Sequence, residues 1–382
     1  MDYDVRLGYE DISIVPEVIS DIVSRKECNC FDENQMLPIF TAPMDGVIDL
    51  ESAKRFTANG INTVLPRTIP FDTRVSQLYN NTPNSFVAFS LGEAKELFLK
   101  EGWVDNITHR LRNHIEQQSR KWYVCIDIAN GHMKSLIDAI ADIKKKYGDK
   151  VVVMSGNIAN PKTYELYEKA GCDFVRCNIG SGSRCSTASN TSIFYPSFSL
   201  IKEIWEEKQR LNGKCKIIAD GGIKGYRDIQ KALIYADYVM IGSLFNKAIN
   251  TAGTPYYGKT YSYILGKRFT NPFKTFLKYG KPVKPEDYDK VLKLVKKREL
   301  DVTKNFYGMS TKVAQEKMAN SKEHLKTSEG IVKPQAVEYT LEQWVENEID
   351  YLRSAMSYTN SRTLEEYKNC KWTRNAYRAY ND

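Results

Sequence analysis

The sequence contains no apolar run that approaches the ~18 consecutive residues of a membrane-spanning helix, which argues against a membrane protein. The first sixteen residues, MDYDVRLGYEDISIVP, are acidic and mixed in polarity. They lack the basic start and apolar centre of a secretory signal peptide. Low-complexity segments and internal repeats are missing as well. We therefore expect a soluble protein of the cytoplasm.

Metal ligands and paired cysteines are also scarce. The chain has only four histidines, and its eight cysteines are scattered without a CxxC pair. Structural zinc sites usually combine such pairs with further Cys or His ligands, so a zinc site is not expected. Reduced thiols in a cytosolic compartment fit this spacing better than a disulfide framework.

The length leaves two architectures open. The chain has 382 residues, of which 42% are hydrophobic and 27% charged, an ordinary globular composition. It is long enough for one (β/α)8 barrel of ~250 residues with additions, or for two domains.

The net charge of +8 is partly due to one basic stretch between residues 267 and 304. Nucleic-acid binding is one interpretation of this stretch. We favour a solvated insertion that attracts anionic ligands, so a nucleic-acid partner is not expected. The basic residues are Lys267, Arg268, Lys274, Lys278, Lys281, Lys284, Lys290, Lys293, Lys296, Lys297, Arg298 and Lys304.

Eight apolar runs recur along the first two thirds of the chain, and helical patterns separate them. Most runs are continuous rather than alternating, which is typical of parallel strands buried on both faces. The pattern favours a (β/α)8 TIM barrel over a doubly wound sheet, which usually has fewer strands. The runs are Pro38–Met44, Ile61–Leu65, Ser85–Leu91, Trp122–Ile128, Lys150–Ser155, Asp173–Ile179, Lys214–Asp220 and Ala236–Gly242.

Helices are predicted at Lys134–Lys146, Pro161–Ala170 and Leu341–Ser357. Residues 256–306 and 311–382 lie outside the repeating pattern of strands and helices. We interpret them as an insertion after the eighth strand and a C-terminal helical tail. The prediction is one domain over residues 1–382.

Loops at the carboxyl ends of barrel strands carry the binding and catalytic groups of this fold. After the sixth run comes Asn178-Ile179-Gly180-Ser181-Gly182-Ser183-Arg184-Cys185-Ser186-Thr187. Its glycines permit tight turns and close approach to a ligand or ion. Cys185 is a candidate nucleophile; the alternative is a small buried residue, as expected for the other seven cysteines.

The next two loops predict a phosphate site. Asp220-Gly221-Gly222 follows the seventh run, and Gly242-Ser243 follows the eighth. The carboxylate can bind ribose hydroxyls, while the glycine amides can receive a phosphate at the usual phosphate position of a barrel. Together with Cys185, these loops predict a nucleotide monophosphate held beside a cysteine.

These motifs resemble the family of IMP dehydrogenase and GMP reductase. The resemblance runs over nearly the whole chain, apart from a basic insertion at about Tyr261–Lys304, and the paired regulatory domains of most dehydrogenases are missing. It rests on LGYEDISIVP (7–16), APMD (42–45), CIDIANG (125–131), SGN (155–157), GSGSRCST (180–187), ADGGI (219–223) and MIGSLF (240–245).

The resemblance implies a role for each site residue. Cys185 would attack C2 of the purine, while Thr187 and Glu329 would assist proton transfer. Asp220 would bind the ribose. The phosphate would be held by Ser183, Gly222, Gly242, Ser243 and Tyr307, and the base by Met309 and Ser310. Asp127, Asn157, Arg67 and Lys326 would lie on the cofactor side, and carbonyls of Asn178, Gly180 and Cys185 would coordinate a monovalent cation such as K⁺.

Two reactions remain open within this family. GMP reductase converts GMP to IMP and ammonia with NADPH; IMP dehydrogenase converts IMP to XMP with NAD. The segment Phe306–Ser310 and the short stretch ending at Ser328-Glu329-Gly330 resemble the reductase, whereas Arg176 resembles the dehydrogenase. We favour an NADPH-dependent reductase that forms a homotetramer. A nucleotide-binding regulatory protein that has lost catalysis is a further alternative.

This chain departs from the family pattern at several positions. Asn178 and Ser181 stand where the family usually has Gly and reductases have Pro, and Ala188 replaces an arginine. Pro66-Arg67 replaces a common His-Lys pair, and Lys326 replaces an arginine. Asn tolerates positive φ better than most residues, so we expect the catalytic loop to be retained.

Overall fold

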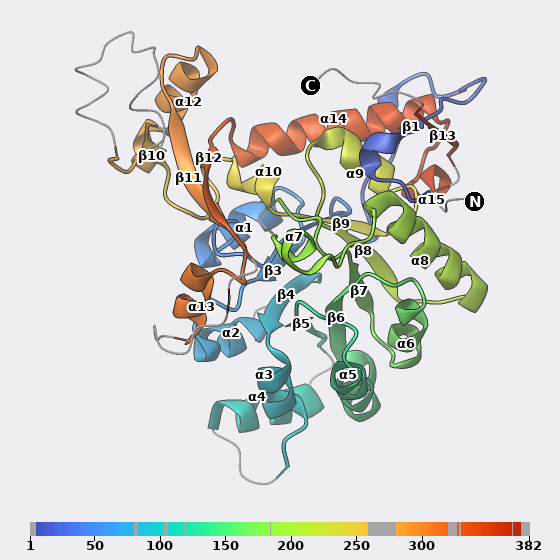
Figure 1. The fold of residues 1–382 in the computed structure, drawn as a ribbon, viewed down its shortest axis with the longest axis vertical. Helices are drawn as coiled ribbons and strands as arrows, with labels where there is room; N and C mark the ends of the chain where they lie inside the picture. The colour runs from blue at the N-terminus through green and yellow to red at the C-terminus, as the bar shows by residue number, and fades with distance from the viewer. Residues whose placement is uncertain are drawn as a thin grey trace.

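Eight parallel strands form a barrel at the centre of the molecule, and helices surround it (Figure 1). The computed structural model describes residues 5–79, 83–101, 106–117, 120–183, 185–258, 280–319, 327, 330–368 and 370–375. The strand order is β2-β9-β8-β7-β6-β5-β4-β3. The strands are β2 (Ile39–Thr41), β3 (Thr63–Leu65), β4 (Ser85–Phe89), β5 (Trp122–Asp127), β6 (Val151–Ile158), β7 (Phe174–Cys177), β8 (Lys216–Asp220) and β9 (Tyr238–Ile241).

The barrel closes between its first two strands. Phe40 and Asn62 form a parallel bridge, and the Thr41 amide donates to the Asn62 carbonyl at 3.0 Å. The buried Asn62 side chain donates to the carbonyls of Leu37 and Ile39, which fixes this junction. Seven of the eight predicted apolar runs contain a whole barrel strand, and the run Lys150–Ser155 covers all but the last three residues of β6 (Val151–Ile158), so the expected TIM barrel is confirmed.

Local sequence signals account for the helix boundaries. Capping boxes begin three of the described α-helices, at Asp49, Ser90 and Thr340, and satisfy amides of the first turn. The three predicted helices correspond to α5, α6 and α14, with ends shifted by at most two residues. The helices around the barrel are α1 (Leu50–Ala58), α2 (Phe71–Leu78), α3 (Leu91–Phe98), α4 (Asn106–Gln117), α5 (Lys134–Tyr147), α6 (Thr163–Lys169), α8 (Ser197–Leu211), α9 (Tyr226–Ala232), α10 (Ser243–Asn246) and α14 (Leu341–Tyr358).

The core has an inner and an outer layer. Side chains that point into the barrel fill it, and Phe40 lies in tilted or edge contact with Phe86, Phe174 and Tyr238 at centroid distances of 5.0–5.9 Å. The outer layer packs the strands against the helices. A barrel plugged by aromatic side chains is not a pore, so ligands bind at its end.

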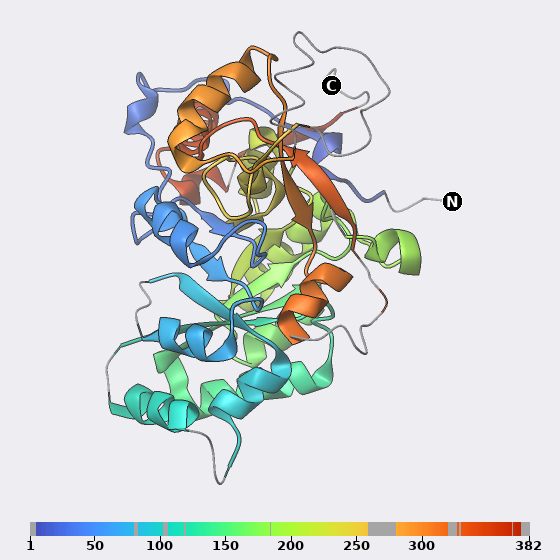
Figure 2. The ribbon, with the colours of Figure 1, turned by 90° about the vertical axis from the view of Figure 1, so that its left-hand side faces the viewer.

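A three-stranded antiparallel sheet lies beside the barrel (Figures 1 and 2). It consists of β10 (Tyr256–Tyr257), β11 (Val302–Tyr307) and β12 (Val332–Ala336), with β11 in the middle. The helix α12 (Tyr288–Lys296) packs on it around the small apolar cluster of Val283, Val291, Leu292 and Val302. The end of β11 leads directly into residues 308–310, so this sheet carries a segment of the site described below.

The predicted basic insertion, 261–304, is only partly described, because residues 259–279 lie outside the described ranges. In its described part the basic side chains are exposed as expected, apart from Lys304. Lys304 is completely buried, and its Nζ donates to the Ala248 and Thr251 carbonyls and to Thr251 Oγ1 at 2.9–3.1 Å. Burial lowers the pKa of Lys304 to about 7. This lysine anchors β11 to the loop after β9.

The two ends of the described chain also meet. Strand β1 (Ile12–Ile14) pairs antiparallel with β13 (Trp372–Arg374), near the short helices at Tyr9–Asp11 and α15 (Leu364–Tyr367). The remaining short helices are Arg25–Glu27, Gly148–Lys150, α7 (Thr187–Thr191), Pro285–Asp287 and α13 (Lys312–Ala319). Within the described ranges, none of the helices combines the length and apolar character required to cross a membrane.

Candidate active site

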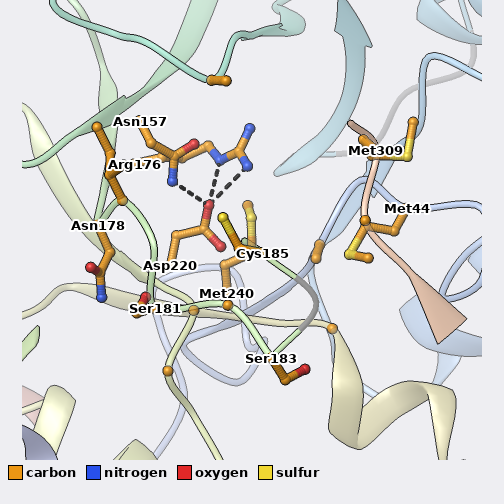
Figure 3. A pocket seen from close by; sticks show the side chains of 18 of the residues that line it. Met44, Asn157, Arg176, Asn178, Ser181, Ser183, Cys185, Asp220, Met240 and Met309 are labelled. Atoms are coloured by element: carbon orange, nitrogen blue, oxygen red, sulfur yellow. Dashed lines mark hydrogen bonds and ion pairs between the residues drawn. The ribbon is translucent and has the colours of Figure 1, made fainter. Parts of the chain in front are cut away.

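A cavity of about 370 Å³ opens at the carboxyl ends of the barrel strands (Figure 3). Nearly all the site residues predicted from sequence that the structure describes line it, from six strand ends and from residues 308–310. Tyr307 is the exception. The lining residues from the prediction are Arg67, Asp127, Asn157, Asn178, Gly180, Ser183, Cys185, Thr187, Asp220, Gly222, Gly242, Ser243, Met309 and Ser310.

The loop between β7 and α7 (residues 178–186) places a thiol next to the first hydroxyl of α7. Cys185 is exposed, whereas the other seven cysteines are buried. Its Sγ donates to Thr187 Oγ1 at 3.2 Å, and its amide donates to the Gly182 carbonyl at 2.9 Å. Thr187 is the first residue of α7. An accessible thiol with a hydroxyl within hydrogen-bonding distance is suited to nucleophilic attack with proton transfer.

The described chain resumes after α13 beside the same cysteine. Gly330 forms an antiparallel bridge with Cys185. Glu329 and Lys326, two of the predicted site residues, lie outside the described residues. Their catalytic and cofactor roles therefore stay predictions.

Two carboxylates and two arginines form one network in the wall of the cavity. Arg176 donates to Asp220 Oδ2 through Nε and Nη2, at 3.0 and 2.8 Å, and to Asp127 Oδ1 through Nη1 at 2.6 Å. Arg67 Nε donates to Asp127 Oδ2 at 3.1 Å, and Asn157 Nδ2 donates to Asp220 Oδ2 at 2.7 Å. Figure 3 shows Arg176 and Asn157 converging on this oxygen. Asp220 Oδ1 has no hydrogen bond among the described residues, so it is available to a ligand.

The charges in this network compensate one another. Burial raises the pKa of Asp127, but Arg176 and Arg67 outweigh burial and hold that pKa below its ordinary value. Burial lowers the pKa of Arg176, and Asp220 and Asp127 more than reverse this effect. Cys125, which contacts Arg176, has a pKa raised to about 12 by burial. Cys125 is therefore a buried, neutral thiol beside Arg176.

The predicted phosphate end consists of two glycine turns. Gly221 and Gly222 have φ values of 94° and 76°, a region that favours glycine. A Cβ on Gly222 would lie 3.1 Å from Ser197 Oγ, and one on Gly242 would lie 3.3 Å from Met44 Sδ. These glycines therefore keep backbone amides accessible where the cavity meets the carboxyl ends of β8 and β9.

Asn178 keeps the positive φ that its position requires. Its φ is 131°, its Nδ2 donates to Ser197 Oγ at 2.7 Å, and the side chain is buried. Asn178 Oδ1 is buried without a hydrogen-bond partner within the described part of the chain. An unpaired buried oxygen at this loop fits a monovalent cation, which prefers oxygen ligands.

Tyr307 lies outside the cavity lining, and its neighbour Phe306 lines the cavity instead. The Tyr307 hydroxyl donates to Asp45 Oδ2 at 2.8 Å and accepts from Lys317 Nζ at 2.8 Å. The predicted phosphate contact of Tyr307 therefore has no support in this arrangement.

Sequence reasoning left several lining residues out of the site, among them Ala42, Pro43, Met44, Arg176 and Lys224. Arg176 could have been found from its position, because an arginine within a buried strand must be paired with acids. Met44 follows β2 and so also lies at the end of a barrel strand. The sequence indicates Lys224 as a lining residue only through its position two residues after Gly222.

The chain matches the IMP dehydrogenase / GMP reductase domain family over residues 6–269. Among curated relatives, it is 28% identical to the GMP reductase of Buchnera aphidicola subsp. Schizaphis graminum over 314 residues, 78% of this chain and 86% of the relative. It is 26% identical to the GMP reductase of Caenorhabditis elegans over 331 residues, covering 86% and 78%.

The GMP reductase of Clostridium acetobutylicum is 30% identical over 293 residues, 72% of this chain and 85% of the relative. The domain match covers well over half of the chain, and it includes every barrel strand and the catalytic loop. The chain therefore belongs to the IMP dehydrogenase / GMP reductase family.

Proposed function

We propose that the protein is a GMP reductase, which converts GMP to IMP and ammonia with NADPH through a covalent cysteine–purine adduct. The observation that carries this proposal is the accessible Cys185 thiol, hydrogen-bonded to Thr187 and bridged to Gly330. The GMP reductases among its relatives support the same assignment.

The geometry supports one orientation of GMP in the cavity. Asp220 Oδ1 has no hydrogen bond among the described residues and would accept from the ribose hydroxyls, because Oδ2 is already occupied by Arg176 and Asn157. The amides at Gly222, Gly242 and Ser243, with Ser183, would bind the phosphate. Met309, Ser310 and Met44 would then lie along the purine, and Cys185 would face C2.

In the first step, Cys185 sulfur forms a bond to C2 of the purine and the bond between C2 and the exocyclic amine breaks. The amine leaves as ammonia, so it must take up a proton. Thr187 Oγ1 accepts the hydrogen bond from the thiol and so offers a path for its proton. Glu329 is proposed to polarise Thr187, because Gly330 lies beside Cys185.

NADPH would supply the hydride that replaces sulfur at C2 and releases IMP. Asp127, Asn157 and Arg67 are the described residues proposed to line its side of the cavity, together with Lys326. Asp127 is held in place by Arg176 and Arg67. The terminal Nη atoms of Arg67 have no hydrogen bonds among the described residues, so they can bind an anionic group.

A monovalent cation such as K⁺ is proposed at the catalytic loop. Backbone carbonyls of Asn178, Gly180 and Cys185 would hold it, and Asn178 Oδ1, which is buried without a hydrogen-bond partner among the described residues, belongs to the same loop. The cation would stabilise the backbone conformation that presents the Cys185 thiol.

IMP dehydrogenase is the second candidate, and Arg176 favours it, since reductases tend to have lysine at this position of the sixth strand. A direct test follows absorbance of the reduced nicotinamide in two mixtures. The protein with GMP and NADPH should consume NADPH, and the protein with IMP and NAD should produce no NADH. The reverse result would assign the dehydrogenase reaction.

If the protein catalyses neither reaction but still binds GMP, a nucleotide-binding regulatory protein would be favoured instead. Cys185→Ala should abolish turnover while leaving GMP binding measurable by calorimetry. Full turnover in this variant would refute the covalent mechanism.

We also propose that the protein assembles as a homotetramer. Val18, Ile19 and Val23 are largely exposed in one N-terminal loop, and exposed apolar groups of this kind often mark contacts between proteins. Light scattering of the purified protein tests this assembly; a monomeric mass would contradict it.

A further inference from the structure

Three polar side chains from separate elements meet just outside the cavity. Asp45 follows β2, Tyr307 ends β11, and Lys317 lies in α13. Asp45 Oδ2 accepts from Tyr307 Oη at 2.8 Å and from Lys317 Nζ at 2.6 Å. Lys317 Nζ also donates to Tyr307 Oη at 2.8 Å and lies 5.5 Å from the centre of its ring. Each member of this group, the Asp45–Tyr307–Lys317 clasp, thus contacts both others.

The clasp is more than an exposed ion pair. The Asp45 side chain is only 13% exposed, although that of Lys317 is 52% exposed. Asp45 Oδ1 is buried and lacks a hydrogen-bond partner within the described ranges. Charge-assisted bonds to a shielded carboxylate are less screened by water than bonds at the open surface. Tyr307 and Lys317 therefore provide the hydrogen bonds that hold this carboxylate.

The chain connects the clasp to two methionines of the cavity. Met44 immediately precedes Asp45, and Met309 comes two residues after Tyr307. Both methionines line the cavity, and Figure 3 shows them along one side, away from Asp220 and Arg176. Fixing Asp45 to Tyr307 and α13 therefore fixes the separation of the two chain segments that carry these methionines.

A second contact between the same segments is independent of the clasp. The buried Asn246 side chain donates to the Gly46 carbonyl at 2.5 Å and to the Asn305 carbonyl at 3.5 Å. This bridge, together with Lys304, holds the body of β11. Loss of the clasp should therefore release residues 308–318 without releasing residues 302–305.

We infer that Asp45, Tyr307 and Lys317 are positioning residues that set the distance between Met44 and Met309 and so shape the wall for the purine base. The assignment of that wall to the base of GMP rests on the proposed function. The clasp also gives Tyr307 a role different from the phosphate contact predicted from sequence. Asp45 and Lys317 are new members of the site.

Amide hydrogen exchange in the protein without ligand tests the clasp itself. Asp45→Asn and Lys317→Met should each speed exchange in residues 308–318 about fivefold, the scale expected when a partly shielded charged hydrogen bond is lost. Exchange in residues 302–305 should not change. Lys312→Met is the matched control, because Lys312 is an exposed lysine on the same helix. Unchanged exchange in both clasp variants, or an equal effect of the control, would overturn the inference.

Calorimetric binding of GMP then tests the effect on the base wall. Lys317→Met, Asp45→Asn and Tyr307→Phe should each weaken binding by about three- to tenfold, because the wall is no longer preorganised. Lys317→Arg should retain most of the affinity, since arginine can donate to the same two oxygens.

Because the three residues act as a unit, the double variant of Asp45 and Lys317 should bind GMP about as weakly as either single variant. A loss confined to Tyr307→Phe would assign Tyr307 to the phosphate and overturn the positioning role. If the wild-type protein neither binds nor reduces GMP, the proposed function fails, whereas the exchange experiment still decides whether the clasp exists.

Discussion

Arg176 donates two hydrogen bonds to a single oxygen of Asp220, Oδ2, from Nε at 3.0 Å and from Nη2 at 2.8 Å. Its remaining Nη1 donates to Asp127. One arginine from β7 therefore orients the carboxylates at the ends of β5 and β8. The side chains of all three residues are nearly buried. Removal of the arginine would leave two carboxylates close together in a poorly solvated site.

Arg176→Met should therefore destabilise the protein by about 3–5 kcal/mol, the usual effect of leaving buried charges unpaired. Urea unfolding followed by fluorescence measures this change. Adding Asp127→Asn to the variant should restore part of the stability, because one of the two carboxylates is then neutral. Unchanged unfolding of Arg176→Met would contradict the pairing seen here.

Asp220→Asn tests whether the free carboxylate oxygen binds the ribose. The Kd of GMP should rise roughly tenfold to a hundredfold, as expected for a lost hydrogen bond to a charged group. A 2′,3′-dideoxy analogue of GMP serves as the control ligand, because it has no hydroxyls to bind. The substitution should leave its Kd almost unchanged; an equal loss for both ligands would place Asp220 elsewhere in the mechanism.

Thr187→Val removes the hydroxyl that accepts from Cys185 and keeps the side-chain shape. If Thr187 moves a proton to the leaving amine, kcat for GMP reduction should fall by about a hundredfold or more. Thr187→Ser retains a hydroxyl and should keep most of the rate. Equal rates for wild type and Thr187→Val would remove Thr187 from proton transfer, whatever the role of Cys185.

Sequence patterns predicted the barrel because buried parallel strands require continuous apolar runs, and each of the eight runs overlaps one barrel strand. They predicted Cys185, Asp220 and Gly222 as lining residues for a related reason: polar groups at strand ends meet at one face of a barrel. Both inferences depend on features that are local in the chain.

Contacts between distant residues could not be predicted in this way. The partners of Arg176 lie 44 and 49 positions away, and no local pattern indicates which acids it binds. Tyr307 illustrates a second limit. Neighbouring residues of a strand point to opposite faces, so a shift of one position exchanges Phe306 and Tyr307 between the cavity and the clasp.

A pH-dependent contribution to stability is expected from Glu348, a completely buried residue of α14. Gln230 Nε2 donates to Glu348 Oε1 at 3.4 Å. Glu348 Oε2 and Gln230 Oε1 are both buried without hydrogen-bond partners among the described residues. A proton on Oε2 would let the carboxyl group donate to the amide oxygen, so protonation would satisfy both atoms.

Burial raises the pKa of Glu348 well above its ordinary value, and the bond from Gln230 reduces this rise only in part. The folded state therefore holds this proton more tightly than the unfolded state. The bound proton contributes its full stabilisation below the pKa that Glu348 has in the unfolded state. This stabilisation is lost as pH rises through the pKa of Glu348 in the folded state. The neighbouring Cys30, Tyr226 and Tyr367 also have raised pKa values, mainly because of burial, so they stay neutral over this range.

Glu348→Gln should stabilise the protein at about pH 8 by roughly 1–3 kcal/mol, because the amide oxygen can still accept from Gln230 Nε2 and no charge is buried. At about pH 4, near the unfolded pKa of a glutamate, the difference from wild type should become small. Urea unfolding of both proteins across this range measures the difference. Glu346→Gln, a change at an exposed position of the same helix, is the matched control. A Glu348→Gln variant less stable than wild type at about pH 8 would show that the buried carboxyl group has a partner as an anion.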